Sequence, residues 1–231
     1  MSDFLQIFEN EKKVLAAFSL RAAGDLKNNP ENQKKFFQQF GIDFKKVVFM
    51  NQVHSAYVEY VGGSSNWIKG TDGIFTDKKG IILAVNTADC LPIFVYSSNP
   101  KFVGIIHGGW RCLTAGILQI FFKKANEKFD LDFSNIKAVI GPGIHCCHFE
   151  IKKDVISKFN KYSQFIIIKK DNKMFVDLPA MAKEILTKIG LSMYNIKSEK
   201  DCTFCQEKKY YSFRREKKDL EGEMLGFIGL I

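Results

Sequence analysis

Three short apolar segments in the middle of the chain constrain its fold more than any other feature. They cover residues 81–85, 91–96 and 102–106. A helix that crosses a bilayer needs about 20 apolar residues, so segments this short indicate fully buried strands instead. Ser98, Asn99 and Pro100 separate the second segment from the third, which predicts a hairpin.

The rest of the chain alternates between helical and strand patterns. The segment after Asn29 and Pro30 has three phenylalanines on one helical face and ends at Gly41, which predicts an amphipathic helix. Further helices are predicted at 114–129, 152–162 and 178–189, and strands at 4–18 (one or two), 46–49, 57–61, 138–140, 165–168, 194–196 and 210–213, with a loop at 62–73. Linkers and repeats are absent from the sequence, so we predict one α+β domain over residues 1–231, a mixed α/β sandwich with helices beside mixed sheets.

Composition and charge limit the choice of partners. The formal net charge of +9 comes from 34 Lys and Arg against 25 Asp and Glu, and the lysines are spread along the chain. This spread and the lack of a nucleic-acid-binding motif argue against nucleic acid, whereas small phosphate-bearing molecules stay candidate partners. The polar N-terminal segment does not resemble an export signal, so we expect a cytoplasmic protein, without membrane contact, whose six cysteines are reduced thiols.

Two of the four histidines and one cysteine stand where apolar segments begin or end. His54 and His107 lie at turns, and Cys90 lies between them in the sequence TADCLP. Imidazole and thiolate are ligands that zinc accepts in tetrahedral geometry. Three protein ligands leave a fourth position for water or substrate, so the pattern predicts a catalytic zinc site, with copper a weaker alternative.

Other functions can be built on the same side chains. Without a metal, Cys90 could act as a nucleophile with His107 as its base and Asp89 or His54 as the orienting group. A binding module that uses the metal only for stability is a further alternative. Copper-dependent oxidation is less well supported because four histidines are too few for a multicopper cluster.

Glycine and arginine residues near these positions suggest an anion site. The pair Gly108 and Gly109 allows close approach of the backbone to a ligand, and Arg111 offers a planar fork for phosphate or carboxylate. Arg214 and Arg215 offer a second fork, although adjacent residues of a strand face opposite ways and Arg215 could equally pair with a surface carboxylate.

The remaining cysteines are predicted to have no joint role. Cys202 and Cys205 form a CxxC pattern without a second such pair, which favours unrelated thiols. Adjacent Cys146 and Cys147 point to different sides of an extended chain, so a second metal there is not expected. His145, in the same segment, is predicted to form a wall of the pocket.

Six ordered segments resemble the YfiH family, whose members carry the labels multicopper polyphenol oxidase or laccase, purine nucleoside phosphorylase and peptidoglycan editing factor. They are NQVH, TDGIFTD, TADCLPI, IIHGGWR, GPGIHCCHFEI and YYSFRRE. The resemblance implies that His54, Cys90 and His107 bind zinc in a mixed α/β sandwich with one chain per site. It also implies phosphorolysis of purine nucleosides, including methylthioadenosine, and deamination of adenosine.

The chemistry of these implied reactions suggests roles for further residues. Asp89, Cys90 and Arg111 are the expected catalytic residues, with Asp89 as the proton shuttle for deamination. Nucleoside and phosphate are the expected ligands, and the residues expected to bind them are Arg21, Asn51, Gly109, Arg111 and Arg214. The sequence departs from the family pattern at His145, Cys146 and His148, and around Arg21, where the segment is shortened. Editing of a cell-wall precursor by a Cys-His hydrolase is the alternative function.

Overall fold

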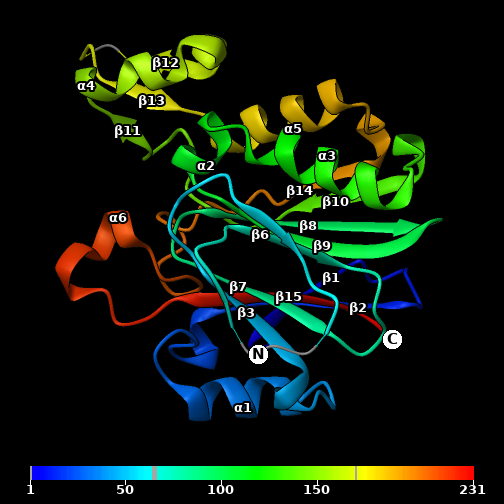
Figure 1. The fold of residues 1–231 in the computed structure, drawn as a ribbon. Helices are drawn as coiled ribbons and strands as arrows, with labels where there is room; N and C mark the ends of the chain where they lie inside the picture. Colours follow the sequence, from blue (N-terminus) through cyan, green and yellow to red (C-terminus); the bar gives the residue numbers. More distant parts are fainter. Residues whose placement is uncertain (1, 64–66, 170) are drawn as a thin grey trace.

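Two six-stranded sheets stack face to face in the computed structural model, which describes residues 2–63, 67–169 and 171–231 (Figure 1). In spatial order, the first sheet contains β1 (Phe4–Ile7), β2 (Val14–Ser19), β15 (Met224–Leu230), β7 (Ile82–Thr87), β3 (Val47–Asn51) and β5 (Trp67–Lys69). The second contains β14 (Ile196–Ser198), β10 (Ile136–Ile140), β8 (Leu91–Ser98), β9 (Lys101–Gly108), β6 (Gly73–Thr76) and β4 (Val58–Tyr60). Both sheets mix parallel and antiparallel pairs.

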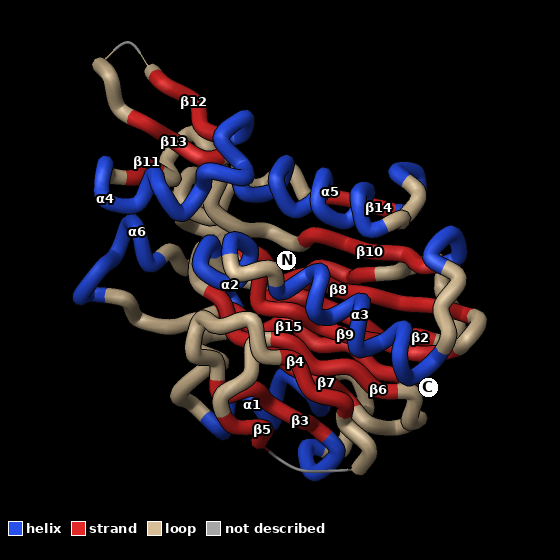
Figure 2. Tube along the Cα trace, turned by 45° about the horizontal axis from the view of Figure 1, so that its top comes forward, coloured by secondary structure: helices blue, strands red, loops and turns tan. Residues whose placement is uncertain are grey.

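Helices cover the outer faces of the two sheets. Helix α1 (Pro30–Gln38) lies against the first sheet, and α3 (Ile117–Phe129) and α5 (Leu178–Ile189) lie over the second (Figure 1). Helix α1 begins where its sequence predicts, because the Asn29 side chain accepts a hydrogen bond from the Asn32 backbone N–H. Short helices α2 (Trp110–Thr114), α4 (Lys153–Ile156) and α6 (Phe213–Glu216) gather toward one end, where the sheet of β11 (Glu150–Ile151), β13 (Met174–Val176) and β12 (Ile166–Ile168) projects (Figure 2).

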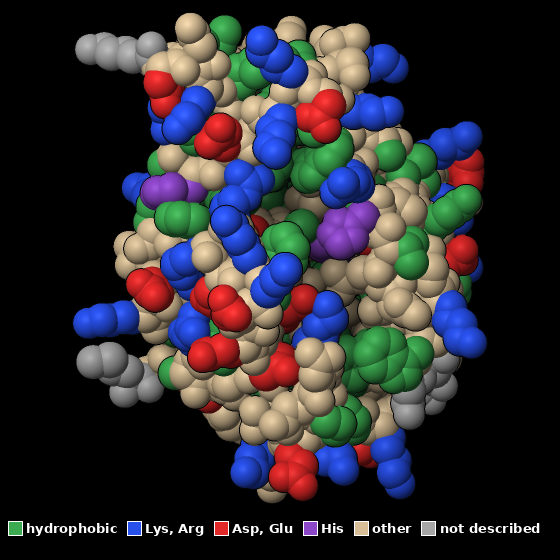
Figure 3. All heavy atoms as spheres, turned by 90° about the vertical axis from the view of Figure 1, so that its left-hand side faces the viewer, with side chains coloured by type: hydrophobic (Ala, Val, Ile, Leu, Met, Phe, Trp, Pro, Cys, Tyr) green, Lys and Arg blue, Asp and Glu red, His purple; other side chains and the backbone are tan. Residues whose placement is uncertain are grey.

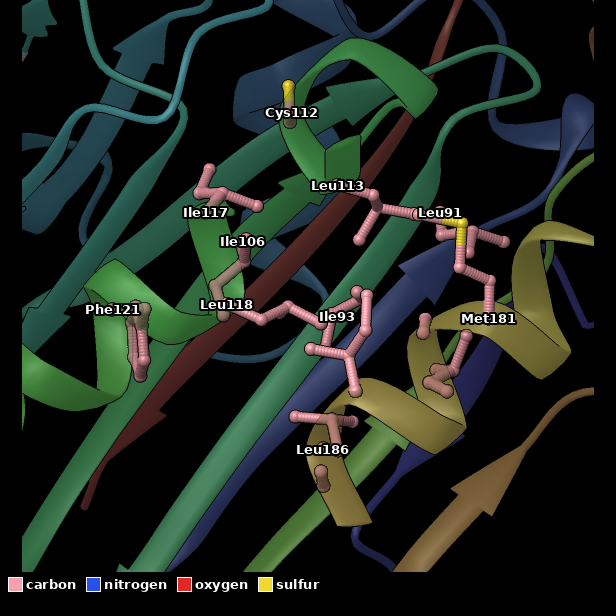
Figure 4. Close-up of a cluster of buried hydrophobic side chains, with 14 of the residues drawn as sticks. Leu91, Ile93, Ile106, Cys112, Leu113, Ile117, Leu118, Phe121, Met181 and Leu186 are labelled. Atoms are coloured by element: carbon pink, nitrogen blue, oxygen red, sulfur yellow. The ribbon is translucent and has the colours of Figure 1, made fainter. Parts of the chain in front are cut away.

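The apolar segments are continuous because each central strand is buried on both faces. On β7, Leu83 lies between the sheets, whereas Ile82 faces the layer of α1. On β8, Phe94 lies between the sheets, whereas Ile93 packs against the helices of the other side. Figure 4 shows side chains of α2, α3 and α5 meeting those of β8 and β9 in this outer cluster. Three apolar layers therefore hold the sandwich together.

The predicted mixed α/β sandwich is confirmed, and most predicted elements are present. Three element predictions are wrong in detail. Residues 210–212 form no strand, because buried Tyr210 and Tyr211 follow an irregular path into α6. The predicted helix at 114–129 is interrupted at Gly116, whose φ of 86° ends the short α2 before α3 begins. The segment 152–162 holds the short α4 and most of a 3-10 helix at Ser157–Phe165 in place of one α-helix.

Several shorter elements differ from the prediction as well. The predicted loop at 62–73 contains β5, and its residues 64–66 lie outside the described part of the chain. The strand predicted at 194–196 begins at Ile196, after a 3-10 turn at Met193–Asn195. Further 3-10 turns lie at Arg21–Ala23, Phe44–Lys46, Phe133–Asn135 and Lys217–Asp219. Within the described ranges, no helix has the length and apolar character needed to cross a membrane.

Candidate metal centre

Three distant segments bring His54, Cys90 and His107 together at one end of the sandwich. His54 follows β3, Cys90 lies in the turn from β7 to β8, and His107 lies near the end of β9. Their ligand atoms all lie within 4.8 Å of one another, and the two imidazole rings are 4.8 Å apart at 77°. The convergence predicted from the sequence is therefore present in the fold.

The register of the β8–β9 hairpin and side-chain hydrogen bonds bring the three residues together. In the β8–β9 hairpin, Pro92 pairs with His107, which places Cys90 just beyond the strand end on the same edge. The Gln52 side chain donates to the Asn86 carbonyl and accepts from the Asn86 N–H, both at 2.9 Å, and so fixes the turn before His54 to the end of β7. His54 itself has a φ of 58°, a strained conformation of the kind often found at functional sites.

Asp72, which no sequence motif marks as a site residue, connects two of the three segments. Its Oδ1 lies 2.8 Å from His107 Nδ1 and accepts from the His54 N–H at 3.0 Å, while its Oδ2 accepts from the Ser55 N–H at 2.7 Å. The carboxylate is fully buried. Burial raises the pKa of Asp72, but the hydrogen bonds from His107 and Ser55 outweigh it and lower the pKa to about 2.

The pairing with Asp72 determines which nitrogen of His107 can bind a ligand. Because Nδ1 points at the carboxylate, Nε2 is the nitrogen that is free to face Cys90 and His54. Burial lowers the pKa of His107. The neighbouring Cys90 thiol and Asp72 carboxylate favour the protonated imidazole and raise this pKa well above its ordinary value. A signal for Asp72 was present in the sequence only as the first Asp of TDGIFTD.

Cys90 has the properties of a thiolate ligand. Burial raises the pKa of its thiol, but the neighbouring charge of His107 and hydrogen bonds with His107 and His54 outweigh this effect and lower the pKa to about 7. His107 is buried, Cys90 is partly buried and His54 is exposed. The group is thus anchored inside the protein and accessible from one side.

Gly109 packs closely against all three side chains. A Cβ added at Gly109 would lie 3.1 Å from Cys90 Sγ, 3.4 Å from His54 Cδ2 and 3.5 Å from His107 Cε1. The residue that was predicted to allow close approach of a ligand therefore packs directly against the ligand group. Two imidazoles and one thiolate form a donor set suited to zinc, and the Asp72 carboxylate orients one of the imidazoles.

Arg111 and Arg214 lie together in a groove beside α2. The groove has a volume of about 370 Å³ and is lined by residues of α2, of segment 149–155 and by Arg214. The Arg111 guanidinium lies 4.4 Å over the Trp110 ring, and Arg214 Nη1 donates to the Glu150 carbonyl at 2.9 Å. On the face that carries α4 and α6, Figure 3 shows a hollow between histidine side chains and surrounded by Lys and Arg.

Asp89 is buried beside Cys90, with both carboxylate oxygens engaged. Its Oδ1 accepts from the Thr203 hydroxyl at 2.6 Å and its Oδ2 from the Arg214 N–H at 2.6 Å. Burial raises the pKa of Asp89 in spite of these hydrogen bonds. Asp89 has a φ of 89°, so the turn before Cys90 is held in a conformation that few residues adopt.

The other predicted residues, Arg21, Asn51 and Arg215, are not among the residues that line the groove or form the His54 group. Arg21 Nη1 pairs with Glu216 at 2.6 Å and Nη2 with Glu221 at 2.8 Å, so its charge is already compensated by two carboxylates. Asn51 ends β3 with an exposed side chain three residues before His54. Arg215 turns inward to the carbonyls of Thr203 and Phe204 and pairs with Glu216, and it does not line the groove.

Cys202 and Cys205, which the lone CxxC pattern predicts to be accidental thiols, have other potential metal-binding side chains as neighbours in the fold. The fold brings them together with Cys147 and His148 in a second group whose ligand atoms lie within 4.8 Å of one another. Cys146 is not part of this group, in line with the expectation that adjacent cysteines point apart. No local pattern links Cys147 and His148 to Cys202 and Cys205, because the two halves of the group are more than fifty residues apart in the sequence.

Comparison with known proteins agrees with this architecture. The family model described as "Multi-copper polyphenol oxidoreductase laccase" matches residues 16–231. The crystal structure of a hypothetical protein YfiH from Bacillus licheniformis superposes with a TM-score of 0.92 at 25% identity, covering 100% of this chain and 97% of the other.

Relatives with named activities are similar over most of the chain. Purine nucleoside phosphorylase YlmD of Bacillus subtilis is 27% identical, over 100% of this chain and 93% of its own length. Purine nucleoside phosphorylase YfiH of Escherichia coli is 30% identical, over 92% and 87%. Adenosine deaminase RL5, from an unknown prokaryotic organism, is 28% identical, over 77% and 72%. These matches show that the chain belongs to the YfiH/YlmD family, whose model carries the polyphenol oxidoreductase laccase description.

Proposed function

We propose that this protein is a zinc-dependent enzyme that cleaves purine nucleosides with phosphate and deaminates adenosine. The observation that carries the proposal is the group of His54, Cys90 and His107, with Asp72 orienting His107 and one side accessible. The names of the relatives, purine nucleoside phosphorylase and adenosine deaminase, supply the substrate class. Bound zinc would supply Lewis acidity at the open position.

Phosphorolysis requires a bound phosphate, which Arg111 and Arg214 in the groove could hold. A phosphate oxygen forms a bond to C1′ of the ribose while the bond from C1′ to the purine nitrogen breaks, and charge shifts onto the departing base. Arg111, exposed on the first turn of α2, and Arg214, which lines the same groove, would hold the phosphate dianion beside the nucleoside. A groove of about 370 Å³ is of the size that small-molecule sites have.

Deamination requires a group that exchanges protons with water and with the departing ammonia. Asp89 is our candidate, because burial raises the pKa of its carboxyl and it adjoins Cys90 in the chain. The Arg214 N–H and the Thr203 hydroxyl hold its orientation. Replacement Asp89→Asn should lower deamination more than phosphorolysis, and equal losses in both reactions would instead indicate a purely positioning role.

The direct test is incubation of the purified protein with adenosine, inosine and methylthioadenosine, with and without phosphate. Chromatography should show free base and the 1-phosphate of the sugar (ribose, or methylthioribose from methylthioadenosine) only when phosphate is present, and inosine from adenosine in either case. Absence of all these products from zinc-loaded protein would refute the proposal.

A metal-dependent reaction must be separated from a thiol-dependent one. Metal analysis distinguishes zinc from copper, and His54→Ala should abolish turnover with a modest loss of stability if the ion is catalytic. A Cys-His hydrolase would behave differently: alkylation of Cys90 would inactivate even metal-free protein, and removal of the metal would leave activity intact.

A further inference from the structure

A second group of metal-binding side chains lies apart from the His54 group. Cys147 Sγ is 3.5 Å from Cys202 Sγ and 3.5 Å from Cys205 Sγ, and Cys205 Sγ is 3.2 Å from His148 Nδ1. All four ligand atoms lie within 4.8 Å of one another. Three sulfur donors and one nitrogen donor therefore lie close enough together to bind one ion.

The separations between sulfurs fit a tetrahedral ion and do not fit a covalent bond. Zinc binds sulfur at about 2.3 Å and histidine nitrogen at about 2.0–2.1 Å, which in a tetrahedron separates two sulfurs by about 3.8 Å and sulfur from nitrogen by about 3.6 Å. A disulfide would need a sulfur–sulfur distance of about 2.05 Å. The observed 3.5 Å between sulfurs lies close to the first value and far from the second.

The backbone around the group holds these donors in place. The Thr203 N–H donates to the Gly143 carbonyl at 3.0 Å, which joins the turn of Cys202–Cys205 to the turn of Cys147 and His148. The His145 N–H lies 3.4 Å from Cys202 Sγ, as expected for an amide that stabilises a thiolate. The His148 ring stacks on Phe204 at 3.9 Å and 14°, which fixes the orientation of the imidazole.

We propose that Cys147, His148, Cys202 and Cys205 bind a zinc ion in a closed structural site. Three thiolates and one imidazole complete a tetrahedron, so no position stays open for substrate, in contrast to the group of His54. Zinc replaces the three thiol protons, which pass to the solvent. This proposal is independent of the nucleoside activity.

The proposed zinc site lies next to the residues that hold Asp89 in place. Thr203, between two of the proposed ligands, donates to Asp89, and Asp89 precedes Cys90 in the chain. Arg215 donates to the carbonyls of Thr203 and Phe204 and so ties the same turn to α6. Zinc at this site would fix the segment that holds Asp89 and would thereby stabilise the wall of the candidate active site.

Metal content is the primary test. Under reducing conditions with excess zinc and subsequent desalting, the wild-type protein should retain two zinc ions per chain. The variant Cys205→Ser should retain one, and the matched control Cys146→Ser, in a cysteine outside the group, should retain two. One ion in the wild type and an unchanged content in Cys205→Ser would overturn the proposal.

Cobalt substitution distinguishes the two sites and does not depend on activity. Loaded with Co²⁺, the His54→Ala variant should keep the strong near-ultraviolet absorption of several thiolates bound to one ion, and Cys205→Ser should lose most of it. Thiol titration of the denatured wild type should find all six cysteines reduced. A disulfide among Cys147, Cys202 and Cys205 would contradict the site, whereas loss of nucleoside cleavage with both ions present would contradict only the proposed function.

Discussion

At the scale of single residues, Asp72 has the most connections in the candidate centre. One carboxylate accepts from the backbone of His54 and Ser55 and pairs with the side chain of His107. It therefore fixes the position of one proposed ligand and the ring orientation of another. Such a residue affects metal affinity by orienting the ligands, without binding the metal itself.

Replacement Asp72→Asn should weaken zinc binding by about 10–100-fold, because the amide cannot accept from all of these donors and does not favour the required ring orientation of His107. Competition with a zinc indicator measures the affinity. The matched control is Asp77→Asn in the same TDGIFTD segment, whose carboxylate accepts from Tyr60. Equal zinc affinity in Asp72→Asn and the wild type would show that Asp72 has no role at the metal.

Gly109→Ala tests the space around the ligand group. Its new Cβ would lie 3.1 Å from Cys90 Sγ, a contact closer than that group can accommodate without a shift. We expect reduced zinc occupancy and reduced turnover in a protein that still folds. The control is Gly63→Ala, because a Cβ there would meet nothing within 4 Å. Retention of full zinc occupancy in Gly109→Ala would show that the group is looser than described.

At the scale of elements, α6 depends on the charge of Glu216. This carboxylate accepts from Arg21 and Arg215, both at 2.6 Å, and joins the helix to the segment after β2. Burial raises the pKa of Glu216, but the hydrogen bonds from the two arginines outweigh it and lower the pKa below its ordinary value. A lowered pKa means that the charged form stabilises the fold above the ordinary pKa of glutamate and that this contribution disappears as the pH falls through the lowered value.

Glu216→Gln should therefore lower the free energy of unfolding by about 1–3 kcal/mol at neutral pH, with the difference from the wild type shrinking as the solution becomes acidic. Urea denaturation over a series of pH values measures this. Glu127→Gln, in an exposed pair with Lys123 at 3.9 Å, should change stability little at any pH. A difference for Glu216→Gln that is independent of pH would rule out the charge as its cause.

The elements also show what the sequence could and could not predict. The three central strands β7, β8 and β9 are predictable because burial on both faces leaves continuous apolar segments. Their ends indicate Cys90 and His107, and the end of the predicted strand at 46–49 indicates His54. Strand β15 was missed because Gly226 and Gly229 interrupt its apolar pattern. A Cβ at Gly226 would lie 2.8 Å from Phe94 Cζ, so this glycine is required by close packing of the sheets.

The connections between elements were harder to predict. Asp72 looked like an ordinary turn residue in GTDG, and its role depends on the β6–β9 register, which no local pattern contains. The second cysteine group depends on a contact between the turns at 147 and 202, and only the folded chain brings these together. Local periodicity therefore predicted the strands and their ends, whereas long-range contacts determined the partners of the ligands.

At the scale of the whole molecule, stability is concentrated in the apolar layers. Phe227 is fully buried between the first sheet and α1, and its ring contacts those of Phe36, Phe37 and Phe40. Phe227→Ala should lower the free energy of unfolding by about 3–5 kcal/mol. Chemical denaturation measures this loss, and Tyr194→Ala, at a side chain that is 90% exposed, should cost far less. Similar losses in both variants would contradict the described packing.

The route of the chain through the candidate centre has a consequence for assembly. His54 extends from the first sheet, His107 belongs to the second, and Cys90 lies where the chain passes from one to the other. A small shift of one sheet relative to the other would therefore separate the ligand atoms of His54, Cys90 and His107. An ion at this site would thus bind tightly only when the two sheets have docked in the correct register.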